Sequence, residues 1–444
     1  MSHHDCHACR EYNELSRRGF LKAGGLALLA TGIPAWLPRF VFARNFVGSR
    51  DVIIYVFLRG GADGLTMVTP YGDPSYATLR PNLKLLPPDG GTGSCLPLSN
   101  SNYFGLAPGM APLLEPYEAG QLAIVHASGY VVPSPSRSHF DAQHFVEVGK
   151  FNDPTIFTGW LGRHLADTGA VMPTAPVRAI GVGNGLQLSM VGAPESIPVP
   201  GLATSTAPSY NITGSSSTAT ARLSRLNTMY NATTDPLRTA AATTQATISL
   251  LNNIGFSTYQ PAGGAVYPNT AFGYAMKSSA AVIKANVGIE AIAIDKTGWD
   301  LHASLGPVNG AMNTLLSDLA GGMQAFYRDV MENSTQNAVV VVMSEFGRRA
   351  AENGSAGADH GYGNVMLLMG QRISGGHVFC HDTTGAAGWP GLGPGQLFQN
   401  LDLAATIDFR TVLSEVCQNL LQNTNLADVF PGFTQQPFLG VTSI

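Results

Sequence analysis

Two short runs in the carboxyl-terminal third of the chain carry side chains suited to binding a metal ion. Glu345 ends a run of apolar β-branched residues, and Asp359 and His360 lie in the Gly-rich stretch that follows. Carboxylate and imidazole ligands together suit zinc, manganese or iron, whereas calcium takes oxygen ligands alone. A buried strand would deliver Glu345 at its carboxyl end, where ligands bind in open α/β sheets. We therefore interpret the two runs as parts of a candidate metal site.

Two further runs offer ligand atoms. Asp300 and His302 stand two residues apart, so on an extended loop their side chains point to the same side and can share one ion. Asp63 lies in a Gly-rich loop, where glycines let the backbone approach an ion closely. The structural alternatives are a hydrogen-bonded Asp300–His302 pair and an ordinary turn around Asp63.

The run Ser-Arg-Ser at 136–138 offers a nucleophile. We expect a helix from here to about residue 148, and a hydroxyl at a helix amino terminus lies beside backbone N–H groups that stabilise an anion. Ser138, or failing it Ser136, is the candidate nucleophile toward phosphate or sulfate, and Arg137 is a candidate clamp for the anion. A capping box between Ser138 and Asp141 is the structural alternative. The other arginines that could clamp an anion are Arg59, Arg348 and Arg349.

The elements that must position these residues follow from the apolar pattern. Continuous rather than alternating apolar runs predict strands that are buried on both faces, as in a parallel sheet. These strands are expected at residues 52–58, 122–126, 177–182, 291–294, 339–343 and 365–369. Apolar residues spaced by three and four predict amphipathic helices at 308–330 and 412–421. The sequence therefore predicts a three-layer α/β/α fold with a mainly parallel central sheet.

Residues 203–285 differ from the rest of the chain. They are rich in Ser, Thr and Ala, begin with a loop-like stretch at 203–217, and continue with helical patterns through 251 and again across 271–285. We expect a helical insertion or cap over the edge of the sheet where ligands bind. A disordered linker is the alternative for the first part alone.

The amino terminus predicts export. Ser-Arg-Arg-Gly-Phe-Leu-Lys at 16–22 has the pattern of a twin-arginine signal, so residues 1–43 are expected to be removed and residues 44–444 to form a single domain. Glycines and a proline interrupt the apolar stretch that follows, which is shorter than the roughly 20 residues a membrane span needs. We expect the twin-arginine translocase as a partner, a periplasmic or secreted location, and no stable membrane span after processing.

The composition limits the possible partners and disulfides. The formal net charge is −4, and nothing in the sequence indicates nucleic acid as a partner. Charged residues make up only 12% of the chain, beside 51 Gly and 28 Pro, which is typical of a loop-rich exported protein. Cys95, Cys380 and Cys417 remain after the signal, and this odd number allows at most one disulfide.

Taken together, the motifs resemble a known family. They are Leu-Arg-Gly-Gly-Ala-Asp-Gly (58–64), Arg-Ser-His-Phe-Asp-Ala-Gln (137–143), Gly-Trp-Leu-Gly-Arg (159–163), Gly-Trp-Asp-Leu-His (298–302), Ser-Glu-Phe-Gly-Arg-Arg (344–349) and Gly-Ala-Asp-His-Gly (357–361). With the twin-arginine signal, they resemble the exported bacterial family called domain of unknown function 1501. That family is similar to the alkaline-phosphatase and sulfatase superfamily, whose members have a three-layer α/β fold, two metals and a Ser, Thr or formylglycine nucleophile at a helix amino terminus.

The resemblance implies roles for the candidate residues. It implies that Asp63 and Glu345 bind one metal ion beside Ser138 and that His360 binds the other metal ion. The residues expected to share that ion with His360 are Asp300 and His302, and Asp359 is implied as a further ligand.

The chain departs from the superfamily pattern at two places. Members of the superfamily commonly carry Asp-His where this chain has Glu345 and Phe346. Because a phenylalanine cannot coordinate a metal ion, we expect either one or two ions in this chain. Pro133 occupies the nucleophile position of the sulfatase signature, which argues against formylglycine chemistry.

These expectations lead to two functional hypotheses. The first is an exported metal-dependent hydrolase that uses one or two divalent ions, Zn, Mn or Fe, to cleave a small anionic phosphate or sulfate ester. The second is a catalytically inactive exported protein that keeps the fold and serves envelope assembly or partner binding, because a fold does not fix a function.

Overall fold

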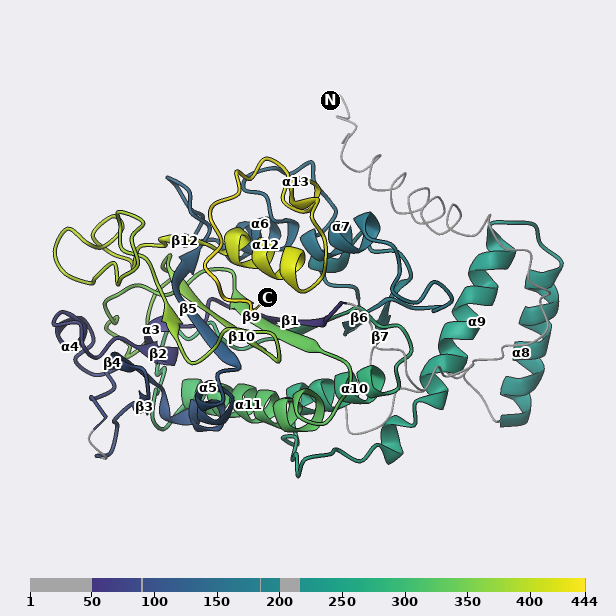
Figure 1. Ribbon diagram of the computed structural model, residues 1–444, viewed down its shortest axis with the longest axis horizontal. Coiled ribbons are helices and arrows are strands. Elements are labelled where there is room, and N and C mark those ends of the chain that lie inside the picture. Colours follow the sequence, from purple (N-terminus) through teal and green to yellow (C-terminus); the bar gives the residue numbers. More distant parts are fainter. Residues whose placement is uncertain (1–49, 89–90, 184, 200–215, 444) are drawn as a thin grey trace, which may run out of the picture.

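The computed structural model describes residues 50–88, 91–183, 185–199 and 216–443 (Figure 1). The predicted signal peptide and the loop-like start of the Ser/Thr/Ala-rich segment lie outside these residues. No helix in the described ranges is long and apolar enough to cross a membrane.

A large, mainly parallel sheet forms the centre of the fold, as the continuous apolar runs predicted. Its strands are β1 (Val52–Leu58), β5 (Leu122–Gly129), β6 (Ala179–Val182), β7 (Ser196–Val199), β8 (Ala291–Lys296), β9 (Ala338–Ser344), β10 (Asn364–Gly370), β11 (Val378–Phe379) and β12 (Ile407–Asp408). Their order is β11-β5-β10-β9-β1-β8-β6-β7, and β12 also pairs with β5. Among these strands β10 alone is antiparallel to its neighbours, β5 and β9. All six predicted strands are therefore confirmed.

Helices cover both faces of this sheet. Figure 1 shows α10 (Ala271–Lys284) and α11 (Ala311–Phe326) on one side, and α6 (His139–Val148), α7 (Trp160–Asp167) and α12 (Phe409–Asn419) on the other. Side chains of β1 alternate between the two cores: Ile54 packs in one cluster with Met323, whereas Ile53 packs in the other with Trp160 and Val412. The predicted mixed α/β layering is confirmed.

Short elements complete the fold. The small sheet consists of β2 (Val68–Thr69), β4 (Ser101–Leu106) and β3 (Leu96–Leu98). The short helices are α3 (Gly64–Met67), α4 (Tyr76–Leu79), α5 (Leu114–Glu118), α13 (Leu426–Val429) and three 3-10 turns at Pro108–Leu113, Leu188–Met190 and Phe256–Thr258. The helix predicted at 308–330 is α11 followed by one π-helical turn, Tyr327–Met331.

The predicted insertion is helical but does not lie where we expected it. Its described helices are α8 (Ser216–Asn231), α9 (Leu237–Asn253) and α10, and α10 belongs to the layer that packs on the sheet. Figure 1 shows α8 and α9 at the opposite end of the molecule from α3 and α4. Thr247 Oγ1 donates to the carbonyl of Pro176, 3.1 Å away, just before the amino end of β6. The contact of α9 is thus with the amino-terminal end of a strand, so the expected cap over the carboxyl edge is corrected.

Candidate metal centre

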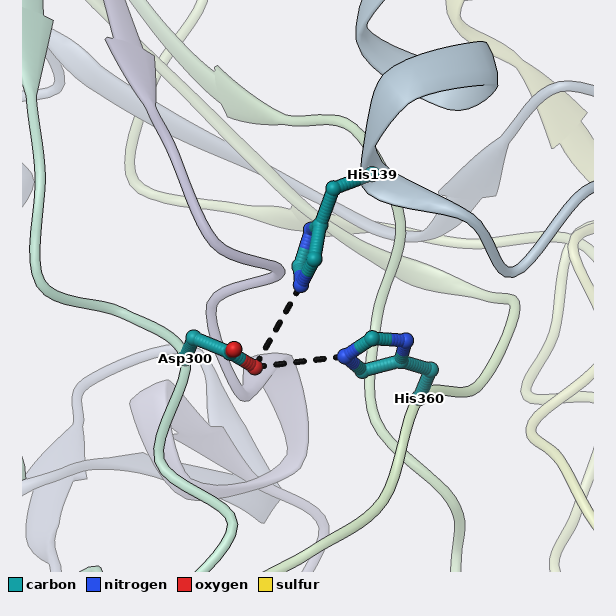
Figure 2. A group of neighbouring side chains, drawn as sticks. All are labelled: His139, Asp300 and His360. Carbon is teal, nitrogen blue, oxygen red and sulfur yellow. Dashed lines mark hydrogen bonds and ion pairs between the residues drawn. The ribbon is translucent and has the colours of Figure 1, made fainter.

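Three imidazoles and one carboxylate converge at the carboxyl edge of the sheet. His139 begins α6, which follows β5; Asp300 and His302 follow β8; and His360 lies on the loop between β9 and β10. Figure 2 shows three of these side chains, His139, Asp300 and His360, pointing toward one another. Asp300 Oδ1 lies 3.3 Å from His139 Nε2, 3.0 Å from His302 Nε2 and 3.2 Å from His360 Nε2. The ligand atoms of His139, Asp300 and His360 all lie within 4.8 Å of one another.

The other ring nitrogen of each imidazole faces a hydrogen-bond acceptor. His139 Nδ1 is 2.8 Å from Glu345 Oε1, and His360 Nδ1 is 2.7 Å from the carbonyl oxygen of Arg137. His302 Nδ1 is 3.3 Å from Asp359 Oδ1. An ionised carboxylate and a carbonyl only accept, so these partners assign the proton to Nδ1 and leave the Nε2 lone pair directed inward. This carboxylate–histidine or carbonyl–histidine arrangement orients imidazoles that bind metals.

The inward-facing nitrogens have few hydrogen-bond donors; Arg348 Nη1, 3.4 Å from His302 Nε2, is one. His302 Nε2 and His360 Nε2 are 2.9 Å apart, and both face the carboxylate of Asp300. His139 Nε2 makes no hydrogen bond within the described residues, although it is buried. A cation among these lone pairs and the Asp300 carboxylate, either added protons or a metal ion, would stabilise the arrangement.

A divalent metal fits this arrangement. Burial lowers the pKa of His360 and outweighs its contacts with the Arg137 carbonyl and Asp300, which raise that pKa, so the neutral form that can bind a metal is favoured. Around a tetrahedral ion with N or O ligands at 2.0–2.1 Å, donor atoms stand about 3.3 Å apart. The spacings of 2.9–3.2 Å among Asp300, His302 and His360 approach that value, and the ligand atoms of His139, Asp300 and His360 lie within 4.8 Å of one another. Either set of three ligands therefore fits a single ion.

Arg348 ties together the loops that carry the centre. Its guanidinium is buried and donates from Nε to the Gly61 carbonyl at 2.6 Å, from Nη1 to the Ala358 carbonyl at 2.9 Å, and from Nη2 to Asp300 Oδ1 at 2.7 Å. Burial raises the pKa of Asp300, but its contacts with Arg348 and His360 outweigh burial and hold that pKa well below its usual range. Asp300 is therefore an anion at neutral pH, and Arg348 has few donors left for a substrate.

A glycine permits this close packing of loops. Gly60 has φ +121°, a backbone conformation that side-chain-bearing residues rarely adopt, and an added Cβ would lie 2.7 Å from the backbone nitrogen of Asp300. The Gly-rich run after β1 thus lets the loop that carries Asp300 approach the strand end.

Glu345 supports the centre instead of joining the convergent atoms. Its buried carboxylate accepts hydrogen bonds from the Gly60 N–H at 2.8 Å, Ser344 Oγ at 2.8 Å and Gln143 Nε2 at 2.9 Å, besides contacting His139. Burial raises the pKa of Glu345, but these hydrogen bonds outweigh it and lower that pKa. The structure therefore places Glu345 behind His139.

Phe346 forms an apolar wall beside the centre. Its ring centroid is 4.9 Å from that of His139 and 4.9 Å from that of His360. The side chain is buried. The position that carries histidine in the resembled superfamily thus packs against two imidazoles and supplies no ligand atom.

Asp63 is not brought to the centre. Arg80, which is fully buried, donates from Nη2 to Asp63 Oδ1 at 2.9 Å and from Nη1 to Oδ2, and Thr66 Oγ1 also donates to Oδ2 at 2.6 Å. Burial raises the pKa of Asp63, but the Arg80 charge and these hydrogen bonds outweigh it and lower that pKa. The expectation that Asp63 and Glu345 share an ion is corrected, because each carboxylate is held by other partners.

The candidate nucleophile lies at the start of α6, next to His139. Ser138 is the N-cap residue, but its side chain makes no capping hydrogen bond. Asp141 Oδ2 instead accepts from Ser136 Oγ at 3.2 Å. The capping-box alternative is therefore excluded, and the Ser138 hydroxyl is not used to close the helix end.

The arginines differ in how firmly they are held. The Arg137 guanidinium pairs with the buried Asp402, with Nε 3.0 Å from Oδ2, so Arg137 contributes to the centre through its carbonyl. Arg59 pairs with carboxylates of neighbouring elements. Arg349 is 40% exposed and lies 3.9 Å from Asp359, a loose contact that leaves it the most freedom to meet an anion.

His139 was not among the ligands expected from the sequence. It directly follows Ser138 in the run Arg-Ser-His-Phe-Asp-Ala-Gln at 137–143, one of the motifs that carry the family resemblance.

The cysteines of the described residues form no disulfide. Cys95, Cys380 and Cys417 are all free thiols, so the one disulfide that their number allowed is not formed among them.

The fold and the site together define an α/β protein with a candidate mononuclear metal centre at the carboxyl edge of a mainly parallel sheet. Residues 132–429 match the family described as Protein of unknown function (DUF1501), and the chain therefore belongs to that family. The matched segment contains the three convergent imidazoles and Asp300, whereas Asp63 precedes it. No curated protein matches the chain.

Proposed function

We propose that this protein is an exported metal-dependent hydrolase of phosphate or sulfate esters with an alkaline-phosphatase-like fold. One observation carries the proposal: three imidazole Nε2 atoms face the carboxylate of Asp300, and each ring is held through Nδ1 by an acceptor. One divalent ion, Zn, Mn or Fe, suits this set of ligands. A second ion is not part of the proposal, because Arg80 holds Asp63 and Glu345 holds His139.

The ion would supply Lewis-acid chemistry, which neutralises charge that develops on the ester oxygens. Ser138 would attack phosphorus or sulfur and release the alcohol, and water would then hydrolyse the serine ester to restore the hydroxyl. The amino terminus of α6 would favour the anion in both steps. Arg349 is the arginine best placed to hold a small anionic substrate, because its side chain is loosely paired.

The cellular setting follows from the predicted signal. The twin-arginine translocase would carry the protein to the periplasm or beyond. This pathway suits a metalloprotein, because folding before transport lets the cytoplasm supply the ion, and metal binding is coupled to folding.

A second candidate function is a catalytically inactive exported protein that keeps one structural ion and serves envelope assembly or partner binding. Two observations favour it. Phe346 packs against His139 and His360 where the resembled enzymes carry a ligand, and Arg80 neutralises Asp63.

Metal analysis of the purified chain, with assays on aryl phosphates and aryl sulfates in Zn, Mn and Fe, separates the candidates. One ion per chain with turnover supports the hydrolase. One ion without turnover on either ester supports the inactive protein. The absence of both stoichiometric metal and turnover rejects the metal centre and the enzyme together.

A further inference from the structure

Gln143 links the candidate metal centre to a group of ion-paired side chains, Arg59, Glu147 and Asp295. It lies one helical turn after His139 in α6, and its Nε2 donates to Glu345 Oε1 at 2.9 Å. Its Oε1 accepts from Arg59 Nη1 at 3.0 Å. A guanidinium only donates and a carboxylate only accepts, so these two partners fix which end of the amide faces Glu345.

Arg59 is itself immobilised by two carboxylates. Its Nη1 and Nη2 lie 3.0 and 3.1 Å from the oxygens of Glu147, at the far end of α6, and its Nε lies 2.9 Å from Asp295 in β8. Since Arg59 directly follows β1, this group joins two central strands to α6. The Gln143 amide oxygen is therefore held by an arginine that is itself ion-paired to two elements of the fold.

We propose that Gln143 is a positioning residue for the metal centre, holding Glu345 so that Glu345 fixes the tautomer and direction of His139. The proposal rests on the proposed function, because it assumes that His139 Nε2 binds the ion. Glu345 Oε1 receives three donors: the Gly60 N–H at 2.8 Å, Gln143 Nε2 at 2.9 Å and His139 Nδ1 at 2.8 Å. Gly60 donates from its backbone, and His139 is itself a proposed ligand. Gln143 is therefore the donor that a side-chain substitution can remove while every proposed ligand stays in place.

The consequence of losing Gln143 follows from these contacts. With leucine at this position, Arg59 Nη1 loses its contact with the Gln143 oxygen, and Glu345 loses a donor on the oxygen that faces His139. Glu345 can then turn toward its remaining donors, and the proton of His139 is no longer fixed on Nδ1. Partners that orient metal-binding histidines in this way typically contribute 10- to 100-fold to metal affinity, so a loss of roughly that size is expected.

Zinc titration of the purified chain tests the proposal. Gln143→Leu should weaken Zn²⁺ binding by about 10- to 100-fold. Gln143→Glu keeps the size but replaces the donor with a second carboxylate beside Glu345, so it should also weaken binding. The matched control is Gln324→Leu in α11, because Gln324 Nε2 likewise donates to a carboxylate, Glu115 Oε2 at 2.6 Å, outside the centre. This control should bind Zn²⁺ as the wild type does.

The tautomer of His139 in the metal-free chain, measured by ¹⁵N NMR after histidine labelling, gives a second result that is independent of metal. The wild type should hold the proton on Nδ1, and either Gln143 variant should show a mixture of tautomers. Unchanged zinc affinity and an unchanged tautomer in folded Gln143→Leu or Gln143→Glu would overturn the proposal. A wild type that binds no Zn²⁺ while its His139 tautomer still depends on Gln143 would overturn the metal centre but leave the positioning contact standing.

Discussion

Replacement of Asp63 by asparagine separates two roles for this carboxylate. The family resemblance implies a metal ligand, whereas the structure shows an ion pair with the buried Arg80. Arg80 also donates to the carbonyls of Ala350 and Arg349, both at 2.9 Å, so its guanidinium is held in place when the charge of its partner is removed. Breaking a buried ion pair from one side costs about 3–5 kcal/mol, because the remaining charge is uncompensated.

We therefore expect Asp63→Asn to lower the free energy of unfolding by about 3 kcal/mol, at the lower end of that range, since the amide oxygen can still accept one hydrogen bond. Its zinc affinity should stay at the wild-type value, because Asp63 is not part of the centre. Urea denaturation gives the first quantity, and zinc titration of the folded variant gives the second.

A double variant strengthens this test. Asp63→Asn combined with Arg80→Met removes both charges, so its destabilisation should be smaller than the sum of the two single effects. The reasoning would be refuted by an Asp63→Asn protein that keeps its stability but loses zinc affinity, which is the result expected of a metal ligand.

Two other predictions concern the nucleophile and pH. Ser138→Ala should abolish turnover of aryl esters while keeping zinc affinity and stability; activity that survives would move the attack to Ser136 or to water. Burial lowers the pKa of His126 to about 4, so its neutral form is favoured in the folded state. Stability from this group is full above the unfolded pKa of about 6.5 and falls by roughly 3 kcal/mol as pH drops to about 4. Urea denaturation across this pH range should show a smaller loss for His126→Asn than for the wild type, and equal losses would contradict the assignment.

The strands of the sheet could be predicted from the sequence because each strand is marked by apolar residues that are consecutive in the chain. Runs such as Val339–Val342 are buried on both faces, and an unbroken apolar run records that burial directly. The apolar pattern does not show in which direction a strand runs. Nothing in residues 364–370 distinguishes β10, which is antiparallel to β9 and β5, from the other strands, and the connection at 345–363 is long enough to allow either direction.

The site was predictable in part. The spacing of Asp300 and His302 predicted that they share an ion, and the family resemblance implied that His360 joins them; the structure brings the three side chains together. His139 was not predicted as a ligand, because the sequence does not show which side chain at the start of a helix points inward.

The partner of Asp63 depends on tertiary contact. Arg80 lies 17 residues further along the chain, beyond three short elements, α3, β2 and α4. Their pairing requires the packing of α3 and α4 against the sheet edge, and no local spacing encodes it. The same holds for α8 and α9, whose Ser/Thr/Ala-rich composition predicts helices but not the end of the sheet to which they attach.

The zinc content of the purified wild type and of His139→Ala tests the central claim most directly. His139 belongs to the centre in the structure, through Nε2 at 3.3 Å from Asp300 Oδ1, although the sequence did not predict it as a ligand. We predict one tightly bound Zn²⁺ per wild-type chain and its loss in folded His139→Ala. A wild type without bound zinc, manganese or iron, or a His139→Ala chain that keeps its ion with unchanged affinity, would contradict the metal centre described above.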